Sequence, residues 1–184
     1  MLKYEAGKNK TGKSVKMYNL IFPVWLILSP LMWPFFAPSA PWILAIVLGN
    51  LLLDWAVVAV SLRCQGVSEV KRRSLAVLLP VWLGGYLADI IGTLGMAAVL
   101  FIDNDWFYHN IHAPLAYLSP FESPWAVLWG VSCLLISAVC IYLFNSRFCL
   151  RKADLTADER KRTALALAVI TAPYTFLMPT NWLY

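Results

Sequence analysis

The feature that most constrains this chain is a series of long apolar stretches joined by short polar segments. A helix rises about 1.5 Å per residue, so a hydrocarbon core of about 30 Å takes roughly 20 mostly apolar residues to cross. The sequence therefore predicts an all-α, polytopic membrane protein, in which a Lys-rich tail at residues 1–17 precedes a helical bundle at residues 18–184. The five expected transmembrane helices are residues 18–36, 42–62, 75–102, 124–144 and 163–183.

The composition supports the membrane class. Hydrophobic residues make up 60% of the 184 residues and charged residues 14%, whereas soluble domains average about 45–50% and about 25%. The first stretch could also be read as a cleaved signal peptide, because Lys residues precede it. Its apolar run is longer than such peptides use and is broken by prolines, so we expect a retained span.

The basic residues predict the orientation. All 15 Lys and Arg residues fall within three segments, at residues 3–16, 63–73 and 147–162. Cytoplasmic loops collect Lys and Arg, so the N-terminus is expected inside and the C-terminus outside. The net charge of +5 is then a topology signal. No nucleic-acid partner is expected, because the charges are split over three short segments, although the tail could touch anionic lipid of the bilayer.

Two aspartates lie inside expected spans. Asp54 is 12 residues from the outer end of its span at Trp42, and Asp89 is 13 residues from Ile102. Both therefore lie roughly 18–20 Å deep, near the midplane. The two spans form a hairpin, so the carboxylates are expected to be neighbours that share a proton or hold a cation. A carboxylate at this depth is costly and is usually functional.

Other polar residues share the helical faces of these aspartates. Asn50 lies one turn from Asp54, while Tyr86 and Thr93 flank Asp89. We expect them to support a proton or cation site, with nearby glycines bringing the two helices close. The alternative is that protonated aspartates simply hydrogen-bond to Asn50, Tyr86 or Thr93 and hold the helices together.

The connection between the third and fourth spans contains the only two histidines. His109 and His112 are spaced for one helical face, with Asp105 and Glu122 nearby, so they could form an outer-loop site or sense pH. Ordinary loop histidines are the stronger interpretation. We therefore expect no metal site and no cofactor.

Two smaller patterns concern the last two spans. Cys133, Ser137 and Cys140 form a small polar stripe, which is typical of a packing face. Thr156 and Glu159 have the spacing of a capping box, which predicts that the last helix begins at Ala157.

Both ends of the apolar region carry a resemblance. The stretches "NLIFPVWLILSPLMW" and "TAPYTFLMPTNWLY" are similar to small uncharacterised multi-pass membrane proteins of Gram-positive bacteria. The resemblance implies no activity.

These patterns leave three hypotheses about function. The first is a transporter- or channel-like protein of a bacterial inner (plasma) membrane, with Asp54 and Asp89 as its proton or cation site. The second is a non-transporting membrane subunit or anchor that docks partners through its basic inner loops, including a substrate-capturing component of an importer. An intramembrane enzyme is the third, and we expect the protein not to be one. Five helices make a thin bundle, so a homo-oligomer or a partner subunit is expected.

Overall fold

The computed structural model describes the backbone of residues 41–180 and the side chains of residues 47–180. Within this part the fold is all-α. Three helices are long and apolar enough to cross a membrane, with qualifying segments at Val47–Cys64, Val70–Phe101 and Pro124–Arg147. The tail at residues 1–17, the expected span at residues 18–36 and the end of the last expected span lie outside the described residues.

The long helices correspond to three of the expected spans. They are α3 (Pro41–Cys64), α4 (Val70–Ala97, extended by a 3-10 turn at Ala98–Phe101) and α7 (Pro124–Arg147). Large apolar side chains remain exposed along all three, as lipid contact requires. Examples are Leu52, Leu79 and Leu128, each about 60% exposed.

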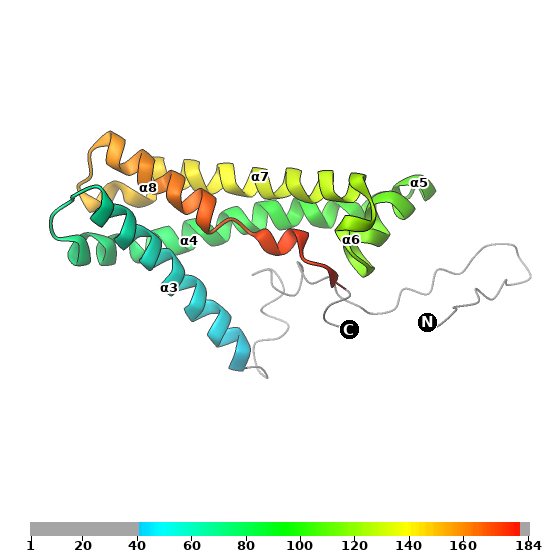
Figure 1. Cartoon of the computed structure of the whole chain (residues 1–184), viewed down its shortest axis with the longest axis horizontal. Coiled ribbons are helices and arrows are strands. Elements are labelled where there is room, and N and C mark those ends of the chain that lie inside the picture. The colour runs from blue at the N-terminus through cyan, green and yellow to red at the C-terminus, as the bar shows by residue number, and fades with distance from the viewer. Residues whose placement is uncertain (1–40, 181–184) are drawn as a thin grey trace, which may run out of the picture.

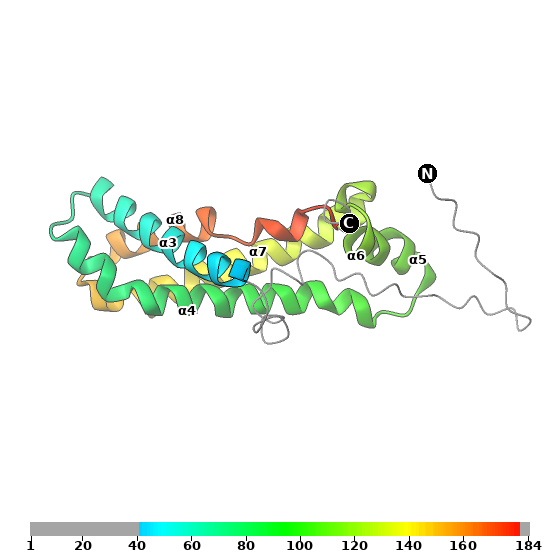
Figure 2. The same cartoon turned by 90° about the horizontal axis from the view of Figure 1, so that it is seen from below.

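Helices α4 and α7 lie side by side along the long axis of the molecule (Figures 1 and 2). Helix α8 (Ala157–Ile170) packs against α7 and α3 at one end. The short helices α5 (Asp105–Phe107) and α6 (Ala113–Tyr117) lie at the other end, joined by a π-helical turn at Tyr108–His112. Helix α3 crosses the bundle obliquely, and in Figure 1 its first half extends away from α4 and α7.

The basic segments at residues 63–73 and 147–162 occupy one end of the bundle, opposite the connection between α4 and α7 (Figure 1). The side chain of Arg73 links them, because its Nη1 donates to the carbonyl oxygens of Ala153 and Asp154 at 3.2 and 2.6 Å. The connection at the opposite end contains carboxylates but no Lys or Arg, a distribution that fits the predicted cytoplasmic position of the basic loops.

Cysteine labelling tests this orientation. Cys64 is exposed at the basic end, so we expect a single-cysteine variant retaining it to react with a membrane-impermeant maleimide in inside-out vesicles only. A second single-cysteine variant, Glu122→Cys at the opposite end, is expected to react in right-side-out vesicles only. Labelling of both from the same side would contradict the predicted topology.

Helix α8 begins as the sequence predicts. Its first residue is Ala157, and the capping box is present. The backbone N–H of Glu159 donates to Thr156 Oγ1 at 3.3 Å, and the backbone N–H of Thr156 donates to Glu159 Oε2 at 2.8 Å. Both donors would otherwise lack partners at a helix start.

The capping box makes part of the stability pH-dependent. Hydrogen bonding from the Thr156 backbone lowers the pKa of the Glu159 carboxyl below its ordinary value. The contribution is therefore present above the pKa of the unfolded chain and is lost as the pH falls through the lowered value. We expect the difference in Tm between wild type and Glu159→Gln, measured in detergent, to vanish between pH 7 and pH 3. A difference that stays constant over this range would contradict the role of the ionised carboxylate.

The last expected span, residues 163–183, differs in the structure. Helix α8 ends at Ile170 after 14 residues, too short to cross a bilayer alone. The chain then turns at Thr171–Pro173 and continues as a 3-10 turn at Tyr174–Leu177. Pro173 explains why helix α8 ends here, because proline has no N–H to donate and restricts the residue before it to extended conformations.

Two apolar clusters fill the interior. One lies toward α8 and includes Ala88 of α4 and Ile141 of α7. The other lies toward α5 and α6 and includes Met96 of α4 and Cys133 of α7. Polar residues lie between the two clusters along both helices, so a polar layer separates two apolar cores. On α4 and α7 its members are the buried Thr93 and Ser137 and the half-buried Asp89.

Candidate functional site

Asp54 is the carboxylate of α3 that enters the bundle. It is only 4% exposed and points at α4, because its Oδ2 would lie 3.7 Å from a Cβ atom placed on Gly85. The small residue at Gly85 leaves room for this approach. No side chain or backbone group in the described part of the chain donates a hydrogen bond to Asp54.

Asp89 lies one turn further along α4, between α3 and α7. Its Oδ1 accepts a hydrogen bond from Ser137 Oγ of α7 at 3.1 Å. Gly85, which Asp54 approaches, lies one turn before Asp89 on α4. The structure therefore directs Asp54 toward the part of α4 that carries Asp89, and it gives Asp89 a partner from α7.

The three residues expected to support the aspartates have different surroundings. The side chains of Asn50 and Tyr86 interact with each other across α3 and α4. The ring of Tyr86 also packs edge-to-face on Trp82, with centroids 4.6 Å apart. Thr93 is fully buried, and its Oγ1 has no hydrogen-bond partner in residues 41–180. Asn50 and Tyr86 thus join the aspartates, whereas Thr93 lies a turn beyond them.

A cavity of about 480 Å³ borders Asp89. Its walls are the first half of α3, with Asn50, and the segment that follows α8, with Thr171 and Thr175. This volume is many times the space of about 30 Å³ that one water takes up in the liquid. Asp54 does not line the cavity, so the two carboxylates have different surroundings: one lies against α4 and the other reaches the cavity.

The end of α8 contributes to the same cavity. Ile170 and Thr171 form part of its wall, and the last carbonyls of a helix carry partial negative charge. Side-chain hydroxyls cap two of them: Thr171 Oγ1 donates to the Leu167 carbonyl at 2.9 Å, and the Tyr174 hydroxyl donates to that of Val169. Carboxylate, amide and hydroxyl side chains, from Asp89, Asn50, Thr171 and Thr175, therefore line one cavity.

Two members of this site were missed by sequence reasoning. Ser137 was expected only to pack, although the stripe it forms with Cys133 and Cys140 marked the correct face of α7. The segment Thr171–Thr175 was expected to continue a helix, although Pro173 and Pro179 were the signal for a break.

The outer-loop residues differ in exposure, and both histidine rings pack against Tyr108, with centroids 5.3 Å away for His109 and 5.1 Å away for His112. His112 is buried, stacked on Tyr117 with centroids 5.7 Å apart, and lines a cavity of about 180 Å³ together with Asp103 and Tyr108. His109 is exposed, as are the other two residues of the expected site, Asp105 and Glu122. Nowhere in the described ranges do three His, Cys, Asp or Glu side chains come together to hold a metal ion.

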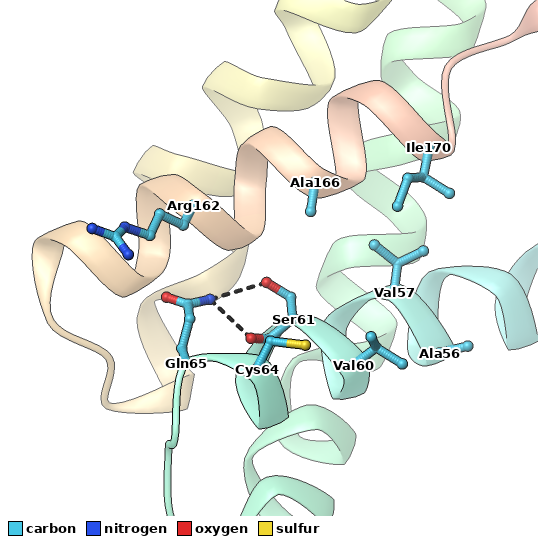
Figure 3. A pocket seen from close by; sticks show the side chains of 9 residues that line it. All are labelled: Ala56, Val57, Val60, Ser61, Cys64, Gln65, Arg162, Ala166 and Ile170. Carbon is cyan, nitrogen blue, oxygen red and sulfur yellow. Dashed lines mark hydrogen bonds between the residues drawn. The ribbon is translucent and has the colours of Figure 1, made fainter.

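A second, apolar cavity of about 360 Å³ lies between α3 and α8 (Figure 3). Val57 of α3 and Ile170 of α8 face each other across it. Of its polar residues, Gln65 and Ser61 are hydrogen-bonded: Gln65 Nε2 donates to Ser61 Oγ and also to Thr163 Oγ1 of α8, both at 3.0 Å. This groove offers an apolar surface and no titratable carboxylate.

Comparison with known proteins identifies no relative of this chain. No family model matches it, and neither the curated proteins nor the solved structures contain a match.

Proposed function

We propose that this chain is a small integral membrane protein that passes protons or small cations across the bilayer, with Asp54 and Asp89 as the binding site. The observation that carries the proposal is the position of Asp89. It borders a cavity large enough for water and lies one turn from Gly85, which a second, buried carboxylate from another long apolar helix, Asp54, approaches. Ionisable residues inside membrane helices usually mark ion or proton pathways.

The environment of the pair supports this role. Two interacting carboxylates in a medium of low dielectric repel each other unless a proton or cation lies between them. Asp54 has no hydrogen-bond donor in the described part of the chain, so a bound proton or cation would satisfy it. Asp89 is held by Ser137, which fixes one side of the site while the other faces the cavity.

The break in the chain after α8 also supports a proton- or cation-binding role. Discontinuous helices at ion sites of transporters point their C-terminal carbonyls at cations. Here the last turn of α8 and the segment Thr171–Thr175 face Asp89 across the cavity. A translocation role is therefore favoured over an enzymatic one, in an inner membrane and in an assembly with further copies or a partner subunit.

One observation favours the alternative of a non-transporting membrane subunit or anchor. The hydrogen bond from Ser137 to Asp89 joins α4 to α7, so Asp89 also serves to hold two helices together. In that case the basic end of the bundle would be the functional surface and would dock a partner.

Flux measurements distinguish the two functions. Wild type and Asp89→Asn, which keeps the shape and can still accept from Ser137, are reconstituted into liposomes. Proton entry is followed with a pH-sensitive dye and Na⁺ or K⁺ entry with cation-sensitive dyes. The proposal expects flux above protein-free liposomes for wild type and at least a tenfold loss for the variant. Equal flux for both would remove Asp89 from the mechanism and leave the structural role.

A further inference from the structure

The basic end of the bundle contains a cavity that the proposed function does not use. It has a volume of about 320 Å³ and lies where the end of α7, the turn at Cys149–Ala153 and the first turns of α8 meet. Four of its lining residues are basic: Arg147, Arg151, Arg160 and Lys161.

These four cations lack partners of opposite charge. No carboxylate lines the cavity, and among residues 41–180 the ion pair at this end joins Arg72 to Glu69 instead. Glu159 neighbours Arg160 in sequence, but its carboxylate accepts from the backbone of Thr156. The Arg151 guanidinium lies over the Phe148 ring at 5.6 Å, which neutralises no charge. Four like charges around one space repel each other unless an anion occupies it.

The cavity is amphipathic along the direction of α7. Tyr142 and Leu143 form the wall nearer the middle of the helix, and Ser146 and Arg147 form the wall at its end. On the same helical face, two turns further in, Ile136 and Val139 are 50% and 55% exposed. An apolar stripe on a candidate membrane helix therefore leads directly into a cationic cavity.

We propose that this cavity binds the phosphate headgroup of an anionic phospholipid, with an acyl chain lying along Ile136 and Val139. Guanidinium groups match phosphate oxygens with two parallel hydrogen bonds. Basic pockets between membrane helices on the cytoplasmic side are known to hold such headgroups. A free phosphate would use the cationic wall but leave the apolar stripe without a role.

The test compares charge-matched variants of the full chain, purified in a neutral detergent. Phosphatidylglycerol or phosphatidylcholine is titrated in, and the lipid retained per protein is counted by native mass spectrometry. The double variant Arg147→Gln/Arg151→Gln loses two lining cations. The control double variant Lys71→Gln/Lys152→Gln loses the same charge from exposed residues outside the cavity. All proteins are first matched for a monodisperse elution profile and for Tm.

The expected result is selective retention of phosphatidylglycerol by wild type, at least about tenfold weaker retention by the cavity variant, and a change within about twofold for the control. Equal loss in both double variants would show diffuse attraction and overturn the proposal, as would equal retention of the two lipids. Competition arms use inorganic phosphate and glycerol phosphate. If either displaces phosphatidylglycerol at equal concentration, the site belongs to a free anion and the lipid proposal fails.

Discussion

The double variant Asp54→Asn/Asp89→Asn is expected to lose no more flux than the more damaged of the two single variants. Residues that act as one unit are strongly non-additive, because removing either member already destroys the shared site. Each single change is expected to lower proton or cation flux by at least tenfold. Independent sites would instead multiply these losses to about a hundredfold. The measurement is the initial flux rate in liposomes at matched protein content.

Asp103→Asn provides the control for this comparison. Asp103 is an exposed carboxylate in the connection between α4 and α7, so its removal changes charge without touching the pair. We expect wild-type flux from it. If the flux lost by the double variant equals the product of the two single losses, Asp54 and Asp89 serve separate steps. A large loss of flux in Asp103→Asn would instead place the charge that controls ion passage at the outer end of the bundle.

Gly92→Ala is expected to lower the free energy of unfolding by about 1–3 kcal/mol, the usual cost of overpacking. A Cβ atom at Gly92 would lie 2.7 Å from Cε2 of Phe176 and 3.0 Å from Cβ of Ser137. The Phe176 ring cannot swing aside, because it is 2% exposed and belongs to the apolar cluster that also contains Met96. The change should therefore separate α4 from α7 and from the segment after α8. Thermal unfolding in detergent measures the effect.

Gly49→Ala is the matched control, since within the described residues no atom outside its own helical turn lies within 4 Å of a Cβ at Gly49. Because glycine weakens a helix relative to alanine, this variant is expected to keep or raise the Tm. Adding Phe176→Leu to Gly92→Ala removes the ring atoms in question and should recover part of the loss. Destabilisation that is the same in both alanine variants would contradict the close approach at Gly92.

The three long helices follow from the sequence because a membrane span is a local property. Apolar runs such as residues 124–144 need only their own length and hydropathy to be recognised. The start of α8 was predictable for the same reason, since Thr156 and Glu159 satisfy donors within one turn. The approach of Asp54 to α4 was predictable because α3 and α4 form a hairpin.

Tertiary packing decided the rest. Whether Asp89 meets Asn50, Tyr86 or a residue of α7 depends on how each helix is rotated, which periodicity within one helix leaves open. The close contacts of Gly92 with Ser137 and Phe176 set that rotation and bring the Ser137 hydroxyl to Asp89.

The sequence by itself determined the three long apolar helices, the segregation of basic residues and the positions of both aspartates along their helices. Each of these depends on composition or on counting residues along one helix. Only the tertiary structure decided that α8 stops at Ile170, that the segment Thr171–Thr175 folds beside Asp89, and that four cations surround one cavity. These features join residues from different helices, so they exist only once side-chain packing has chosen which faces meet.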